Sequence, residues 1–301
     1  MSDREGREAG TPDTSVVEAR AKLNLFLRVL GARADGFHEV ETAILPISLA
    51  DRLEIHAYAD PGEFRTLSLS LEVTGDASLT RLVPRDESNL VLRAATALGE
   101  RTGARGFADI VLTKRVPAAA GMGGGSADAA ATLKALNDLW GCGLKSDELV
   151  EVGADVGSDV PALMVGGPAL ARGRGERVDP VTVRPFRWLV ETFPFPVRTA
   201  DAFRWWEEDG GATGPDPAAL MEAAREGDTE AAGGLMYNDL EVPVLRRHPA
   251  VREARDRLLS AGASGVVMCG SGPTLAALIP GQNEVSSSRG VEVWSAGTAS
   301  S

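Results

Sequence analysis

The first segment that could do chemistry is a glycine-rich loop between a predicted strand and a predicted helix. Residues 121–126 read Gly-Met-Gly-Gly-Gly-Ser, and the segment that follows places Leu133, Leu136 and Trp140 at helical spacing. Glycine lets the backbone approach a ligand closely, and the first turn of a helix presents free N–H groups and a positive dipole end. This arrangement predicts a phosphate site. The alternative is a glycine-rich linker in which Ser126 caps the helix.

The loop does not match the common nucleotide-binding fingerprints. No Gly-Lys pair provides a P-loop, and Ser126 stands where the dinucleotide motif GxGxxG requires its last glycine or alanine. The chain also lacks the HRD and DFG motifs of protein kinases and the HExxH motif of zinc proteases. The loop therefore predicts phosphate binding in a different structural frame.

Two charged residues are candidate catalytic groups. Only four of the 31 basic residues are lysines, and one of them, Lys22, lies in the strand-like segment Ala-Lys-Leu-Asn at 21–24. Its ammonium could orient an anion as a point charge, or it could face solvent. Asp159 lies in the Gly-Ser-Asp-Val-Pro turn at 157–161, where it could act as a general base or cap the next helix. Asp155 competes for the base role.

A second glycine-bounded turn and three ring side chains could contact a ligand. The turn Cys-Gly-Ser-Gly-Pro-Thr at 269–274 stands between two apolar runs, and it either lets a ligand approach the backbone or forms a tight hairpin. Phe37 and Phe203 lie in segments that resemble loops, and His38 directly follows Phe37. The two phenylalanine rings could stack on a base, although aromatic residues more often pack in the core.

Length, charge and cysteine content limit the class of protein. The chain has 301 residues and a net charge of −12, which argues against broad binding to nucleic acid or anionic membranes. No segment is apolar enough over about 18 residues to span a membrane. Cys142 and Cys269 have no metal-ligand spacing, so we expect free thiols and assign no metal ligand. The polar N-terminus lacks a signal or transit peptide, so we expect a cytoplasmic protein with a disordered tail at 1–15.

The elements that must position these residues mix strands and helices without regular βαβ alternation, which predicts an α+β fold. Alternating or apolar runs predict strands within 16–58 and at 66–74, 108–117, 187–196 and 291–297, and a strand–turn–strand unit at 265–280. Helical spacing or helix-favouring composition predicts helices at 89–98, in the second half of 118–141, and at 146–156, 218–227 and 249–261. A glycine-rich seam at 166–175 divides the chain into an N-terminal domain, 16–165, which carries the predicted phosphate site, and a C-terminal domain, 166–301.

Six segments, in this order, resemble motifs of the GHMP kinase superfamily, and the similarity runs from about residue 21 to residue 278. They are AKLNLFL at 21–27, RADGFH at 33–38, PAAAGMGGGSADAA at 117–130, GSDVP at 157–161, NDLE at 238–241 and GSGPT at 270–274. Six motifs in one order are far more specific than any single motif. The resemblance implies a two-domain α+β GHMP kinase fold with the active site in the cleft between the domains.

The first two motifs resemble the cytidine branch of the superfamily. That branch implies transfer of the ATP γ-phosphate to the 2-hydroxyl of a cytidine-diphosphate-linked methylerythritol, in the non-mevalonate isoprenoid pathway. Another small-alcohol acceptor on the same fold, and a non-catalytic ligand sensor, are the alternatives. The resemblance implies ATP and Mg²⁺ as cofactors and small molecules as partners, with no nucleic acid or membrane, in a monomer or weak homodimer.

The resemblance also implies roles by position. Asp159 is the implied base, and Lys22 orients it and stabilises charge. Phe37 and Phe203 are expected to sandwich the cytosine, while His38 bonds its edge. The residues implied to hold the ATP phosphates are Pro117, Ala118, Ala119, Ala120, Gly121, Met122, Gly123, Gly124, Gly125 and Ser126. The residues implied to bind the substrate are Asn24, Phe37, His38, Thr199, Phe203, Gly270, Ser271 and Gly272.

Overall fold

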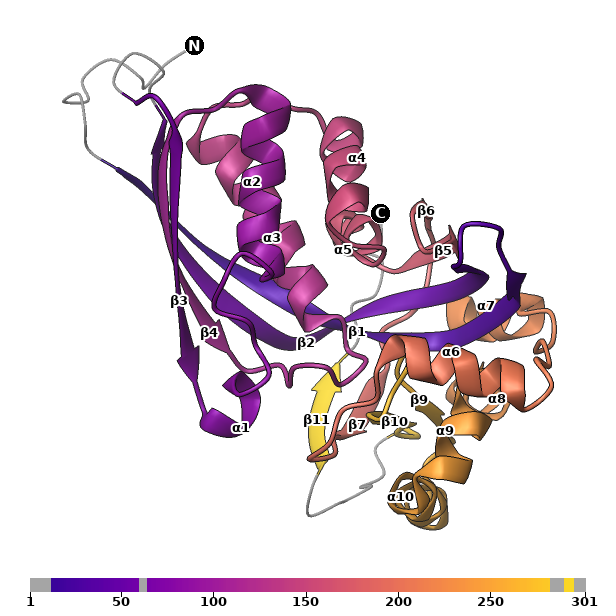
Figure 1. The fold of residues 1–301 in the computed structure, drawn as a ribbon. Coiled ribbons are helices and arrows are strands. Elements are labelled where there is room, and N and C mark those ends of the chain that lie inside the picture. The colour runs from indigo at the N-terminus through magenta and orange to yellow at the C-terminus, as the bar shows by residue number, and fades with distance from the viewer. Residues whose placement is uncertain (1–11, 60–63, 282–289, 295–301) are drawn as a thin grey trace.

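The computed structural model describes residues 12–59, 64–281 and 290–294, and it contains two β-sheets with helices packed around them (Figure 1). The larger sheet has seven strands, β1 Asp13–Ala32, β2 His38–Ala59, β3 Leu67–Gly75, β4 Gly106–Lys114, β5 Ala169–Gly173, β6 Arg177–Pro180 and β8 Tyr237–Asn238. The smaller sheet has four, β7 Arg187–Glu191, β9 Gly265–Met268, β10 Leu275–Leu278 and β11 Gly290–Trp294. These mixed sheets and helices confirm the predicted α+β class.

The helices fall into two groups (Figure 1). The first group packs on the larger sheet or follows β3, and consists of α1 Ala77–Thr80, α2 Leu90–Thr102, α3 Gly124–Leu139, α4 Ser146–Val156 and α5 Val160–Val165. The second group surrounds the smaller sheet and consists of α6 Thr199–Glu208, α7 Ala218–Glu226, α8 Thr229–Leu235, α9 Glu241–Arg247 and α10 Pro249–Ser260. No helix in the described part of the chain has the length and apolar composition needed to cross a bilayer.

The long antiparallel pair β1–β2 joins the two halves of the molecule. It carries register shifts between Arg20 and Lys22, between Asn24 and Phe26, and between Val29 and Gly31. A β-bulge bends a strand and changes the direction of nearby side chains. All residues from 21 to 27 are buried, so the polar side chains of this segment do not face solvent as simple alternation would require.

The three main hydrophobic core clusters all contain residues of β1. Ala19 belongs to the cluster under α2–α4, Leu23 to a central cluster with the smaller sheet, and Val29 to the cluster with α9 and α10. Strand β2 likewise contributes to all three clusters. Burial of apolar surface is the main favourable term in folding, so these two strands fix the halves relative to one another.

The larger sheet contains strands from both sides of the domain boundary predicted at residue 166. Strand β5 pairs with β2, and β6 pairs with β5, so residues 169–180 complete the sheet of the first half. Strand β8 pairs in parallel with β1, which brings a segment of the second half into the same sheet. Strand β1 begins at Asp13, inside the predicted tail, and residues 1–11 lie outside the described residues.

The predicted strands and helices are present, several with shifted ends, and others were missed. The strand expected at 291–297 is β11, an edge strand of the smaller sheet, although residues 295–297 lie outside the described part. The helices α1, α5, α6, α8 and α9 and the short strands β5, β6 and β8 were not predicted. Most of these are brief elements, in which hydrophobic periodicity is weak.

Candidate active site

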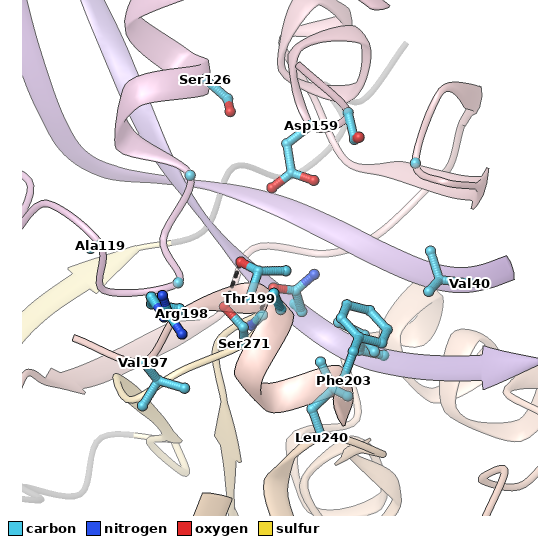
Figure 2. Close-up of a pocket in the computed structure, with 18 of the residues that line it drawn as sticks. Val40, Ala119, Ser126, Asp159, Val197, Arg198, Thr199, Phe203, Leu240 and Ser271 are labelled. Atoms are coloured by element: carbon cyan, nitrogen blue, oxygen red, sulfur yellow. Dashed lines mark hydrogen bonds between the residues drawn. The ribbon is translucent and has the colours of Figure 1, made fainter. Parts of the chain in front are cut away.

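A cavity of about 930 Å³ lies where the two halves meet, and nearly all of the predicted site residues line it. Of the predicted residues, only Gly272 does not reach its wall. Figure 2 shows Ser126 and Asp159 on one side of the cavity and Thr199, Phe203 and Ser271 on the other. The first group comes from the glycine-rich loop, α3 and the turn before α5, and the second from α6 and the β9–β10 turn.

Lys22 lies at the centre of the site with a buried side chain. It is 3% exposed, and its Nζ donates hydrogen bonds of 2.8 Å to Asn24 Oδ1 and 2.8 Å to the carbonyl oxygen of Gly121. The same Nζ is 3.8 Å from Asp159 Oδ2. An ammonium has three donors, so two hold the lysine in the protein and one remains for the cavity. The alternative of a solvent-facing strand lysine is wrong.

Asn24 connects Lys22 to the second glycine turn. Its Oδ1 accepts from Lys22 Nζ and from the backbone N–H of Gly270 at 2.9 Å, and its Nδ2 donates to Thr42 Oγ1 at 2.8 Å. The amide oxygen therefore has two donors already, and one amide hydrogen is left for a ligand. The predicted contact with substrate is restricted to that hydrogen, while the larger role of Asn24 is to hold Lys22 in place.

The glycine-rich loop, residues 117–126, leads directly into α3. Gly121 and Gly123 have φ of +79° and +65°, a region that side chains disfavour, and Gly123 is the N-cap residue of α3. Because Gly123 has no side chain, the N-cap residue accepts no side-chain hydrogen bond from the N–H groups of the first helical turn, which remain available for a ligand. Ser126 lies inside that first turn, so the alternative in which Ser126 caps the helix is wrong.

The glycine-rich loop packs tightly on the β9–β10 turn. A Cβ added to Gly121 would lie 2.0 Å from the carbonyl oxygen of Cys269, and one added to Gly270 would lie 3.0 Å from the carbonyl oxygen of Gly121. Neither position can take a side chain without moving backbone. The two glycine segments that the sequence singled out are therefore one unit in space, with Lys22 Nζ 3.1 Å from the position of a Gly270 Cβ.

Asp159 is the acidic residue that reaches the cavity from the α4–α5 turn. It occupies the N-cap position of α5 but accepts no capping hydrogen bond, and its side chain is 42% exposed. The carboxylate points into the cavity in Figure 2. Asp155 is exposed on α4 and does not line the cavity. The geometry thus favours Asp159 over Asp155 for a role at the substrate.

The aromatic residues form stacks with side chains that were not predicted. His38 stacks on Phe203 with ring centroids 4.4 Å apart, and its Nε2 is 2.9 Å from Glu207 Oε1. Phe37 lies in the β1–β2 turn as expected, under the guanidinium of Arg174. Phe203 lies in helix α6 and not in a loop. Because His38 stacks on one face of the Phe203 ring, only the opposite face is left for a base unless His38 moves.

One further contact joins two parts of the cavity wall. Thr199 Oγ1 and Ser271 Oγ are 3.1 Å apart, which links the start of α6 to the β9–β10 turn (Figure 2).

Cys269 precedes the β9–β10 turn and is buried, and burial raises the pKa of its thiol to about 12. Cys142 and Cys269 are both free thiols, as expected. The Cys269 thiol is therefore protonated at neutral pH and acts as a small packing group.

The comparisons with known proteins agree with this arrangement. Models of the GHMP kinase N-terminal and C-terminal domains match residues 89–167 and 220–291. A 4-diphosphocytidyl-2-C-methyl-D-erythritol kinase from Pelotomaculum thermopropionicum is 44% identical over 258 residues, which cover 85% of this chain and 86% of that protein. The chain belongs to the GHMP kinase family. As a GHMP kinase it is an enzyme that takes ATP as phosphate donor and a small molecule as acceptor.

Solved structures of other kinases share its fold. A crystal structure of 4-(cytidine 5'-diphospho)-2C-methyl-D-erythritol kinase superimposes with a TM-score of 0.75 at 33% identity, covering 94% of this chain and all of the other. A homoserine kinase from Cytophaga hutchinsonii gives 0.65 at 18% identity, covering 93% of this chain and 89% of the other, and shows the likeness of fold alone.

Behind the glycine-rich loop of this GHMP kinase lies a buried charged triad that sequence reasoning missed. Lys114 Nζ bonds Asp51 Oδ2 and is 2.9 Å from Asp128 Oδ2, and all three residues are buried. Asp51 Oδ1 also accepts from the backbone N–H groups of Arg115 and Val116, at 2.6 and 2.9 Å, just before the loop begins. The triad therefore fixes the start of the loop to the sheet and to α3.

The triad places two carboxyl groups against a single ammonium group. Burial raises the pKa of Asp128 to about 7 although the charge of Lys114 lowers it, and Asp128 Oδ1 has no hydrogen-bond partner among the described residues. Burial lowers the pKa of Lys114, but the charges of Asp128 and Asp51 outweigh it, so the pKa is raised overall. The scarcity of lysines pointed to Lys114 as much as to Lys22, and that signal could have found it.

Proposed function

We propose that this GHMP kinase transfers the γ-phosphate of ATP to the 2-hydroxyl of 4-diphosphocytidyl-2-C-methyl-D-erythritol. One observation carries the assignment of the reacting groups. Lys22 Nζ is bonded to the carbonyl of Gly121 in the glycine-rich loop and is also 3.8 Å from Asp159 Oδ2. A cation between a phosphate-binding loop and a carboxylate lies where a phosphoryl group would pass from donor to acceptor. The relatives that carry this acceptor in their names support the choice of substrate.

The donor phosphates are assigned to the glycine-rich loop. The first-turn N–H groups of α3 and its positive dipole end face the loop, and they stabilise negative charge without a P-loop lysine. Phosphoryl transfer needs positioning and charge stabilisation more than covalent chemistry, so backbone donors suit it. The remaining Nζ donor of Lys22 neutralises charge that develops on the transferred group.

The acceptor hydroxyl is assigned to the space beside Asp159. As its oxygen forms a bond to the γ-phosphorus, the bond from that phosphorus to the oxygen bridging it to the β-phosphate breaks, and ADP leaves. The hydroxyl proton moves to the Asp159 carboxylate, which passes it to water through the open side of its partly exposed side chain. Lys22 holds Asp159 by charge and leaves the carboxylate oxygens free to accept the proton.

Mg²⁺ fits this site as an ion held mainly by the nucleotide. Within residues 12–59, 64–281 and 290–294, no three His, Cys, Asp or Glu side chains form a group that could hold a metal. Ser126 and Asp159 nevertheless line the cavity with a hydroxyl and a carboxylate. Mg²⁺ commonly keeps several waters and binds through phosphates and one or two protein oxygens. Bound there, Mg²⁺ would neutralise phosphate charge, and Ser126 would be its protein ligand beside the nucleotide phosphates and water, which leaves Asp159 free to act as the base.

The test is release of ADP from Mg-ATP with a panel of acceptors. The panel contains 4-diphosphocytidyl-2-C-methyl-D-erythritol, homoserine, mevalonate and galactose. We expect turnover with the first compound alone. Turnover with another compound of the panel would support kinase activity but overturn the proposed acceptor substrate. ATP binding without turnover of any acceptor would favour the ligand-sensor alternative.

A further inference from the structure

Arg174 differs from the other arginines around the β1–β2 and β5–β6 turns. Most of the neighbouring guanidinium groups form ion pairs with carboxylates, which neutralise their charge. These pairs are Arg28 with Glu41 at 3.6 Å, Arg33 with Asp35 at 3.1 Å and Glu39 at 2.6 Å, Arg172 with Glu41 and Asp179 at 2.9 Å each, and Arg177 with Glu39 at 2.6 Å.

The guanidinium of Arg174 has an aromatic partner instead. Its central carbon lies 4.9 Å from the centroid of the Phe37 ring, and among the described residues it forms no ion pair or side-chain hydrogen bond. Asp35 is close enough for this charge to contribute to the lowering of its pKa, after the hydrogen bonds from Arg33 and Phe37. A guanidinium stacked on a ring keeps its N–H donors at the edge, where they can meet an anion.

Contacts of the β5–β6 turn fix the backbone position of Arg174 next to the turn that carries Asp159. Its backbone N–H bonds Glu176 Oε2 at 2.6 Å within the β5–β6 turn. The next residue, Gly175, packs against the turn that carries Asp159. A Cβ added to Gly175 would be 3.0 Å from the carbonyl oxygen of Ser158 and 3.8 Å from Asp159 Oδ1. Arg174 therefore lies between the proposed base and the exposed ring of Phe37, and it lines the cavity.

We propose that Arg174 binds the anionic diphosphate linker of the acceptor substrate while its guanidinium stays stacked on Phe37. This inference rests on the proposed function, because it assigns the linker of a nucleoside-diphosphate-linked acceptor. The planar fork of arginine donates two parallel hydrogen bonds to phosphate oxygens. Among the arginines that line the cavity, Arg198 and Arg204 are already paired with Asp201, which leaves Arg174 with free donors.

The first test compares Arg174→Ala and Arg174→Gln with Arg177→Ala, a matched control on the same hairpin. Arg177 is exposed, pairs with Glu39 and does not line the cavity. Hydrogen bonds to charged groups are worth enough to change affinity by about 10- to 100-fold. We expect both Arg174 variants to raise the KM for the acceptor by that factor, with kcat and the KM for ATP changed less than about threefold. An unchanged KM for the acceptor would overturn the proposal.

The second test measures binding affinities directly and distinguishes a contact with the diphosphate linker from a contact with the base. Calorimetry of cytidine, CMP and CDP, with the ATP site occupied by a non-hydrolysable ATP analogue, is run on the unmodified protein and on Arg174→Ala. We expect the unmodified protein to prefer CDP over cytidine and the variant to lose that preference. Equal weakening of all three ligands would show that Arg174 acts on the base, and it would overturn the linker contact. This measurement needs no turnover, so failure of the proposed reaction is distinguishable from failure of the Arg174 assignment.

Discussion

The two ends of the cavity are built in different ways. At the phosphate end, which comprises Lys22, Asn24 and the glycine-rich loop, the side chains are buried and hydrogen-bonded at 2.8–2.9 Å to protein partners. At the acceptor end, which comprises Phe37, His38, Phe203 and Arg174, rings stack on other side chains and Phe37 is 48% exposed. One end is thus preformed by backbone and buried polar groups, while the other consists of half-buried or exposed side chains that stack on one another.

The difference reflects the chemistry at each end. Charge stabilisation in a transition state is effective when the donors are already oriented, because no reorganisation is then needed during the reaction. Recognition of a base and its linker requires only that the correct ligand bind better than others, and aromatic rings that reach the cavity allow that. Substitutions at the phosphate end should therefore lower kcat, while those at the acceptor end should raise KM.

The largest effect is expected from Asp159→Ala. General base catalysis contributes about 10²- to 10⁴-fold, so kcat should fall within that range while nucleotide binding survives. The measurement is steady-state ADP release together with titration of ATP. Asp155→Ala is the matched control, because Asp155 is exposed on α4 and does not line the cavity. A variant of Asp159 that keeps most of its kcat would show that the base is elsewhere.

Gly121→Ala should have the next largest effect, and it tests the preformed loop. The added Cβ would meet the carbonyl oxygen of Cys269 at 2.0 Å, so the loop or the β9–β10 turn must move. We expect a loss of kcat of at least about tenfold and a lower melting temperature. Gly143→Ala is the control, because Gly143 has a similar φ of +72° but no atom within 4 Å of an added Cβ. Equal losses in both variants would mean that backbone strain alone explains the result.

Phe203→Leu tests whether a substitution at the acceptor end raises KM and leaves kcat unchanged. Stacking of a base on an aromatic ring is worth about 1–3 kcal/mol, so the KM for the acceptor should rise about tenfold with kcat nearly unchanged. Phe193→Leu is a suitable control, since Phe193 packs on the same core cluster but does not line the cavity. A fall in kcat without a change in KM would contradict the division between the two ends.

Asp128→Asn should have the smallest effect and should appear in the pH dependence of stability. The raised pKa of about 7 means that, between the ordinary value of 3.8 and 7, folded Asp128 keeps a proton that the unfolded chain has released. The free energy of unfolding should therefore fall with rising pH relative to the variant, by at most about 1.4 kcal/mol per pH unit. Urea unfolding between about pH 5 and 8 measures this difference, and a constant difference would contradict it.

The sequence predicted the residues whose signals are local. Glycine runs and short motifs identified Gly121, Gly270, Lys22 and Asp159, all of which surround one cavity. The sequence left open whether Lys22 faces the site or solvent, because β-bulges near it break the simple alternation of strand side chains.

The residues that were missed depend on long-range contacts. Asp51 meets Lys114 across 63 positions, and no periodicity in the sequence reports such a pair. Arg174 was overlooked because its distinction is the absence of a carboxylate partner, which only the folded arrangement reveals. Helix α6, which carries Phe203, is short and follows a Pro-containing segment, so its residues resembled a loop.

The shared strands have a consequence for how such kinases diverge. Because β1 and β2 contribute to all three main cores, and β5 and β8 pair with them, no cut in the chain separates a donor module from an acceptor module. A chimaera that joined residues 1–165 to the second half of another kinase would set a native β1 and β2 against foreign neighbours. We therefore expect single substitutions around the cavity to change acceptor specificity with less damage to the fold than an exchange of halves would cause.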